Sequence, residues 1–113
     1  AYAWQTLLGQ GTVVASGSDF PVESANPFLG IYAAITRKDI QGNPLGGWYA
    51  NEAMIREQTL RSFTLDAAYA GFQEDILGSL ETGKWADFKI GWGFNAYDIV
   101  QLPFRSWQGW KSC

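Results

Sequence analysis

The order of the segments near the N-terminus limits this chain to few folds. Residues 12–16 (TVVAS) are a short run of small and β-branched residues without polar alternation, which is typical of a strand buried on both faces of a parallel sheet. Residues 1–10 have a helix-like composition and end before Gly11, where a helix stop is expected. Residues 27–36 predict a second helix, with Asn26 as its N-cap and a proline in its first turn. The sequence therefore predicts an α/β fold.

The spacing of apolar residues predicts two further helices. Apolar side chains recur at helical spacing within residues 52–72, with a bend near Thr64 and with Thr64 capping the second helix. The apolar positions expected to lie together are Ile55, Leu60, Phe63, Leu65 and Ala68. Residues 37–51 are rich in Gly, Asn and Pro, so we expect an exposed loop that can carry binding contacts.

The composition changes after residue 72. Glycines followed by the sequence ADFKIG, residues 86–91, predict a turn that leads into a strand and hence a small β element. We expect the strand at residues 12–16 to pair with residues 86–91 or with a second copy of itself, because open apolar strand edges associate.

Composition and charge exclude several function classes. The chain has 113 residues with 11 acidic and 8 basic side chains, a net charge of −3, and no basic cluster longer than Arg37-Lys38. We therefore expect no nucleic-acid partner. The apolar runs are shorter than the roughly 18 residues that span a bilayer, and the N-terminus lacks the features of a signal peptide. These observations predict no membrane partner and a cytoplasmic location.

The supply of reactive side chains is small. Histidine is absent, and the single cysteine is Cys113, the last residue. Nucleophilic His/Cys pairs and zinc sites of His or Cys type therefore cannot be built from this chain. A metal held by this chain alone would need carboxylate ligands.

The tryptophans and the N-terminus both suggest contacts outside this chain. Four of the six tryptophans, Trp85, Trp92, Trp107 and Trp110, fall in the last third, more than a small core can bury with each indole N–H satisfied. This predicts a surface that contacts a neighbour, for example in a homo-oligomer. The first helix-like stretch has no N-cap residue or initiator Met ahead of it, so we expect a fragment of a longer polypeptide.

Two stretches resemble a known family. Residues 63–88 (FTLDAAYAGFQEDILGSLETGKWADF) resemble the C-terminal signature of the amidohydrolase superfamily, G-x-L-x-x-G-K-x-A-D. The matching positions are Gly78, Leu80, Gly83, Lys84, Ala86 and Asp87. Residues 15–37 (ASGSDFPVESANPFLGIYAAITR) resemble the eighth barrel strand and the following loop of amidohydrolase family 3, which includes N-substituted formamide deformylases. Residues 106–111 (SWQGWK) resemble the closing hairpin of that family.

The resemblance implies a fold and an activity. Residues 1–75 would be the end of a TIM-like (β/α)8 barrel with its last strand–helix unit, and residues 76–113 would be part of a small β-sandwich domain. The parent enzyme would hydrolyse non-peptide C–N bonds of a small amide or formamide substrate, with zinc or another divalent metal. The metal ligands of the family would lie upstream of Ala1, so we expect the isolated chain to hold no cofactor and to be inactive. The alternative is a non-catalytic α/β module that associates through its Trp-rich C-terminal surface.

Asp19 is the candidate catalytic residue. It follows the predicted strand and a Gly-Ser turn, and side chains at the C-terminal ends of barrel strands line the active site. The resemblance implies that Asp19 takes a proton from the metal-bound water and passes it to the leaving amine, and makes it a candidate metal ligand. A simpler interpretation is an Asx-type turn in which the side chain bonds to the backbone two residues on. Trp48 could line the substrate pocket or pack on its own loop.

Overall fold

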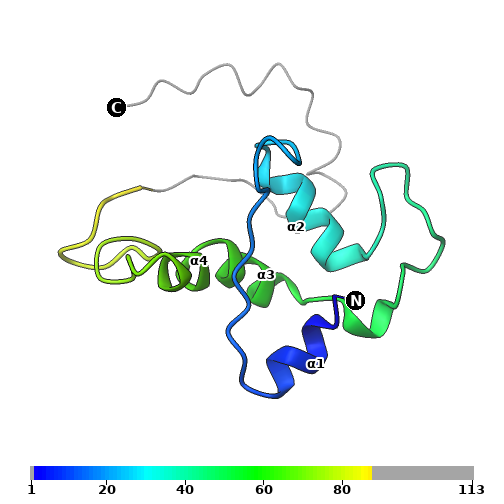
Figure 1. The fold of residues 1–113 in the computed structure, drawn as a ribbon, viewed down its shortest axis with the longest axis horizontal. Helices are drawn as coiled ribbons and strands as arrows, with labels where there is room; N and C mark the ends of the chain where they lie inside the picture. The colour runs from blue at the N-terminus through cyan, green and yellow to red at the C-terminus, as the bar shows by residue number, and fades with distance from the viewer. Residues whose placement is uncertain (1, 88–113) are drawn as a thin grey trace.

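The computed structural model describes residues 2–87, and within them the fold consists of short helices joined by long loops (Figure 1). The helices are α1 (Trp4–Gly9), α2 (Pro27–Thr36), the 3-10 helix η1 (Ala50–Glu52), α3 (Arg56–Phe63) and α4 (Leu65–Ala70). The predicted helices therefore form, including the first one, which is shorter than expected. The predicted loop at residues 37–51 also forms, and η1 begins at its end.

Helix α2 begins and ends with strong local signals. The Asn26 side chain accepts a hydrogen bond from the backbone N–H of Phe28 at 3.1 Å, which confirms the predicted N-cap. Pro27 occupies the first helical turn, where its missing N–H costs nothing. The helix ends at Arg37, whose backbone is left-handed (φ 57°) and whose N–H donates to the Ala33 carbonyl at 2.8 Å. These two ends fix where the loop after α2 starts.

Thr64 separates α3 from α4, which confirms the predicted bend. Its side chain does not cap α4, however, because its hydroxyl donates back to the Leu60 carbonyl at 2.7 Å. The capping prediction is therefore wrong. A threonine hydroxyl that reaches a backbone carbonyl of the preceding turn donates to that carbonyl, and it then does not cap the helix that follows.

The buried side of α3 is polar. Thr59 and Ser62 are fully buried, and their hydroxyls donate to the carbonyls of Ile55 and Thr59 at 3.0 and 2.7 Å. Ile55 and Leu60, two of the apolar positions expected to lie together, are 59% and 40% exposed, so they do not belong to the buried core. Small hydroxyl side chains that hydrogen-bond to carbonyls of their own helix let a neighbouring helix approach closely without leaving a buried polar group unpaired.

No strand forms anywhere in residues 2–87, so the predicted α/β class is wrong for the part of the chain that the structure describes. Within that part, Val13 and Val14 form no backbone hydrogen bond, whereas the Ser16 N–H donates to the Ser62 carbonyl at 2.9 Å. None of residues 12–16 is buried, so the predicted burial on both faces is also wrong, and residues 13–18 alternate between exposed and half-buried side chains. The β-branched residues favour extended dihedral angles, but a strand also needs a neighbouring strand to complete the ladder.

The expected β element is also missing from the described residues. Residues 76–87 form turns, bends and irregular backbone, and neither they nor residues 12–16 contain a strand. The predicted pairing of residues 12–16 with residues 86–91 does not form at 86 and 87, while 88–91 lie outside the described residues. The closing hairpin predicted at residues 106–111 lies outside them as well. Pairing with a second copy stays a prediction.

A small core lies where α2 packs on α3 and α3 on α4 (Figure 1). Its buried apolar side chains are Ile31, Ala34, Met54 and Ala68. The backbone N–H of Met54 donates to the Ala34 carbonyl at 3.0 Å, which joins the segment before α3 to the C-terminal half of α2. Large apolar side chains are mostly outside this core, so the described residues bury little apolar surface for their number.

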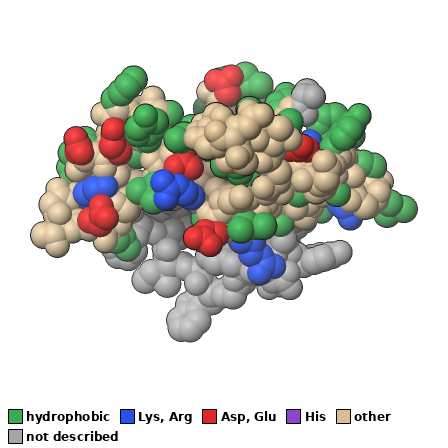
Figure 2. Space-filling view, turned by 90° about the horizontal axis from the view of Figure 1, so that it is seen from below, with side chains coloured by type: hydrophobic (Ala, Val, Ile, Leu, Met, Phe, Trp, Pro, Cys, Tyr) green, Lys and Arg blue, Asp and Glu red, His purple; other side chains and the backbone are tan. Residues whose placement is uncertain are grey.

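The described surface is mixed in charge. On the face drawn in Figure 2, Lys and Arg side chains are interspersed with Asp and Glu and do not gather into one patch. Among residues 2–87, no helix is both long and apolar enough to cross a membrane. Trp85 is 63% exposed, and the other three tryptophans of the last third lie outside the described residues. Association through the Trp-rich end therefore stays a prediction.

Glu52 connects η1 to α1 and should make the stability of the fold depend on pH. Its carboxylate accepts hydrogen bonds from the Thr6 hydroxyl at 2.6 Å and the Thr6 backbone N–H at 3.0 Å, and these bonds lower the pKa of Glu52. A lowered folded-state pKa gives stability that is present above the unfolded pKa and is lost as the pH falls through the folded value. We expect the melting temperature to drop as the pH falls below about 4.5, and Glu52→Gln to flatten this drop.

The control for this prediction is Glu57→Gln. Glu57 is exposed in α3, and its side chain forms no hydrogen bond to the described residues. Thermal melts across the same pH range should therefore give the Glu57 variant the slope of the unmodified chain. Equal slopes for all three proteins would show that the bonds between Glu52 and Thr6 do not contribute.

Candidate functional site

Asp19 lies in a tight turn between residues 12–18 and α2. Its backbone is left-handed, with φ 49°, a conformation that is uncommon for residues other than glycine. The Asp19 carbonyl accepts from the Val22 N–H at 2.8 Å, and the Ser18 carbonyl accepts from the Glu23 N–H at 3.2 Å. The backbone of the turn is thus held by its own hydrogen bonds, and the Asp19 side chain is not needed to close it.

The carboxylate of Asp19 is exposed and forms no hydrogen bond or ion pair with residues 2–87. The Asx-type turn considered above does not form there. The residue two positions on is Pro21, which has no backbone N–H to donate. The carboxylate is therefore available to accept a proton or to bind a ligand.

The described residues do not form a metal centre. Within residues 2–87, no group of three or more Asp, Glu or Cys side chains lies close enough together to hold a metal ion, and the chain has no histidine. Asp19 could supply one ligand of a centre completed elsewhere, and its role as a ligand stays a prediction. No catalytic step through a metal follows from these residues.

Trp48 belongs to the other end of α2. Its ring lies 4.8 Å from the Arg37 guanidinium carbon, just past the last residue of α2, and packs edge-on against Tyr49 at 4.7 Å between ring centroids. Asp19 precedes the first residue of α2, a helix of 10 residues that spans about 15 Å. The structure therefore does not bring Trp48 and Asp19 together. Contact of Trp48 with a substrate stays a prediction.

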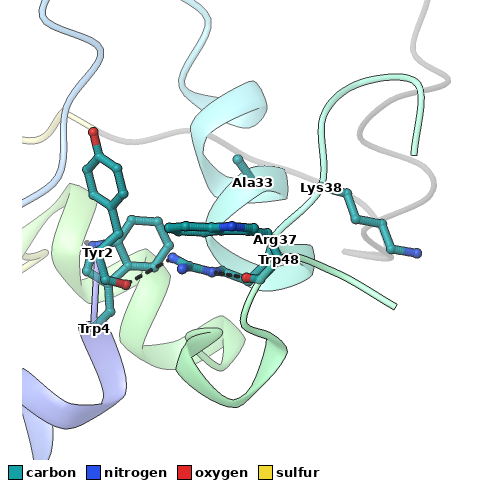
Figure 3. A pocket seen from close by; sticks show the side chains of 6 residues that line it. All are labelled: Tyr2, Trp4, Ala33, Arg37, Lys38 and Trp48. Atoms are coloured by element: carbon teal, nitrogen blue, oxygen red, sulfur yellow. Dashed lines mark hydrogen bonds between the residues drawn. The ribbon is translucent and has the colours of Figure 1, made fainter. Parts of the chain in front are cut away.

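A cluster of aromatic side chains surrounds Arg37 (Figure 3). This residue is 6% exposed, with its guanidinium 4.5 Å from the Trp4 ring centroid and 4.8 Å from that of Trp48. Its Nε donates to the Trp48 carbonyl at 2.8 Å, and Nη1 donates to the Tyr2 carbonyl at 3.1 Å. The cation thus joins the start of α1, the end of α2 and the following loop.

One nitrogen of Arg37 is left over. Its Nη2 is buried and has no hydrogen-bond partner among residues 2–87. The cluster borders a cavity of about 290 Å³, lined by Tyr2, Trp4, Ala33, Arg37, Lys38 and Trp48. Sequence reasoning did not single out this cluster, because its members lie far apart in the sequence. The local signal, a dipeptide of two basic residues, is typical of a solvated surface.

Comparison with known proteins identifies the family. Residues 1–101 match the amidohydrolase family. The chain belongs to this family. Among curated amidohydrolase-family relatives, the putative amidohydrolase YtcJ of Bacillus subtilis strain 168 is 31% identical over 90 residues, which cover 80% of this chain and 17% of that protein. The N-substituted formamide deformylase of Arthrobacter pascens is 29% identical over 86 residues, covering 76% of this chain and 15% of that protein.

A plant protein is also similar to this amidohydrolase-family chain. The protein LONG AFTER FAR-RED 3 of Arabidopsis thaliana is 37% identical over 115 residues, which cover 98% of this chain and 19% of that protein. The chain thus spans less than a fifth of each of these three relatives. No solved structure matches it. The family generally uses divalent metals, and the described residues of this member do not contain a site for one.

Proposed function

We propose that this chain is the C-terminal part of a metal-dependent amidohydrolase that cleaves a non-peptide C–N bond in a small amide or formamide. Membership of the amidohydrolase family and the similarity to an N-substituted formamide deformylase support this reaction class. The observation that carries the proposal is the carboxylate of Asp19, exposed on a left-handed turn and free of bonds to the described residues. We call the longer polypeptide that would contain this chain the whole protein.

Asp19 has the chemistry of a proton carrier. Water attacks the carbonyl carbon of the amide, its proton passes to the Asp19 carboxylate, and the C–N bond breaks as the proton moves on to the leaving nitrogen. The products are a carboxylic acid and an amine, and Asp19 returns to its starting charge. A divalent metal such as zinc, held by residues outside the described range, would polarise the carbonyl group.

The proposal predicts a difference between the chain and the whole protein. The described residues supply one proton acceptor but no metal centre, so the isolated chain is proposed to be inactive. The whole protein is proposed to be a cytoplasmic enzyme that acts on small molecules.

An assay with formanilide, an N-substituted formamide, tests this. The whole protein should release aniline and formate in equal amounts, whereas the isolated chain should release neither, even with added Zn²⁺. Turnover by the isolated chain would contradict the proposal that this segment needs the rest of the protein for activity. A metal-loaded whole protein that hydrolyses neither formanilide nor a panel of simple amides would overturn the reaction class.

A further inference from the structure

We propose that Arg37, together with the indole rings of Trp4 and Trp48, forms a binding site for a carboxylate. Arg37 is 6% exposed and forms no ion pair with any residue in the range 2–87. A buried cation without a counter-ion is costly, and its cost falls when an anion binds beside it. The Arg37 charge contributes to the lowered pKa of Glu52, but the two side chains form no ion pair, and the Glu52 oxygens accept hydrogen bonds from Thr6.

The guanidinium has donors to spare for such an anion. Arginine carries five N–H donors, and the two hydrogen bonds that Arg37 makes to backbone carbonyls come from Nε and Nη1. Nη2 is left without an acceptor among the described residues. A carboxylate is the acceptor best matched to a guanidinium edge, because its two oxygens can take parallel hydrogen bonds.

The cavity defines the rest of the ligand. Its volume of about 290 Å³ is at the lower end for small-molecule sites, and three of the six side chains that line it are aromatic. Lys38 also borders the cavity, but Figure 3 shows its side chain extending away from the guanidinium. The site therefore fits a small carboxylate with an apolar group, such as a single aromatic ring.

Access to Nη2 requires a movement of Trp48. Nη2 is covered in the present conformation, and the Trp48 side chain is part of its surroundings. The backbone of Trp48 is fixed by two hydrogen bonds to Arg37, each 2.8 Å long, whereas Trp48 remains 41% exposed. Because Trp48 is more exposed than Trp4, rotation of the Trp48 indole is the movement that would let a carboxylate reach the guanidinium.

The test uses benzoate as the probe and the indole N–H resonances as the readout. Benzoate should shift the signals of Trp4 and Trp48, with a Kd on the order of 1 mM. It should leave the signal of Trp85, which is 63% exposed, in place. Benzamide, which has the same ring and no charge, should shift none of them.

Variants test which side chain supplies the positive charge that binds benzoate. Arg37→Gln should weaken benzoate binding about tenfold or more, because it removes a charged donor. Arg56→Gln, which removes one positive charge from an exposed residue of α3 that does not line the cavity, is the control and should bind like the unmodified chain. Asp19→Asn should also leave binding unchanged, so the carboxylate site and the proposed reaction can fail separately. If Arg37→Gln does not fold, the shifts of Trp4 and Trp48 in the unmodified chain still locate the site.

The same titration on the whole protein distinguishes two sources of the carboxylate. Binding of benzoate there indicates a free small molecule. Loss of binding there, with binding retained by the isolated chain, indicates that a carboxylate side chain from the rest of the protein occupies the site. The proposal is overturned if benzoate leaves the signals of Trp4 and Trp48 in place in both proteins, or if benzamide shifts them equally.

Discussion

Replacing Gly78 by alanine is expected to lower the free energy of unfolding by about 2–4 kcal/mol. Gly78 has φ +90°, and a Cβ atom added there would lie 2.9 Å from the Ala68 Cβ, 3.1 Å from the Leu65 Cα and 3.2 Å from the Thr64 carbonyl oxygen. Two of these atoms belong to the backbone at the start of α4 and cannot rotate away. The turn after α4 would have to separate from the helix.

Gly83→Ala is the matched control. Gly83 has φ +96°, but a Cβ added there would meet no atom within 4 Å among the described residues. Its substitution should therefore cost only the backbone strain, about 1 kcal/mol. Urea unfolding of both variants measures the difference, and equal losses would show that the contact between Gly78 and α4 does not stabilise the chain.

The helices were predictable because their signals are local. Asn26 and the proline after it specify the start of α2 within two residues, and the structure shows the expected N-cap bond at 3.1 Å. The bend at Thr64 was predictable for the same reason. Which side of α3 is buried was not predictable, because Thr59 and Ser62 are buried by contacts made through tertiary packing.

The strand was not predictable from its own residues. The sequence of residues 12–16 favours an extended backbone, and residues 13–18 do alternate between more and less exposed side chains. Whether an extended segment becomes a strand depends on a partner elsewhere, and residues 2–87 supply none. Local propensity favoured an extended backbone for this segment and failed to predict that no strand forms and that none of residues 12–16 is buried.

The two candidate sites differ in how far apart their residues lie in the sequence. Asp19 was identified because residues 15–37, a contiguous stretch, resemble amidohydrolase family 3 and place this acid after a Gly-Ser turn. The Arg37 site was missed because it is built from the start of α1, the end of α2 and Trp48. No spacing rule connects these positions, and only the folded chain places two indole rings beside one guanidinium.

Asp19→Asn in the whole protein is expected to lower kcat by about 10²–10⁴-fold with little change in KM. The amide has the shape of the carboxylate, but it cannot take the proton of the attacking water or return it to the leaving nitrogen. Because the Asp19 side chain forms no hydrogen bond to the described residues, the substitution should not disturb the turn. The effect should therefore appear in turnover and leave the melting temperature unchanged.

Asp39→Asn is the control for the loss of one negative charge. Asp39 is an exposed residue of the loop after α2, where its carboxylate accepts hydrogen bonds from the backbone N–H groups of Gln41 and Asn43 at 3.0 and 2.9 Å. Asparagine can accept the same bonds through its amide oxygen. This variant should keep both the fold and the turnover number.

The most direct measurement is the initial rate of aniline release from formanilide by the whole protein, its Asp19→Asn variant and its Asp39→Asn variant, each with circular dichroism to verify folding. The account predicts equal rates for the unmodified protein and Asp39→Asn, and a rate lower by about 10²-fold or more for Asp19→Asn. A folded Asp19→Asn variant with the rate of the unmodified protein would contradict the assignment of Asp19 as the proton acceptor.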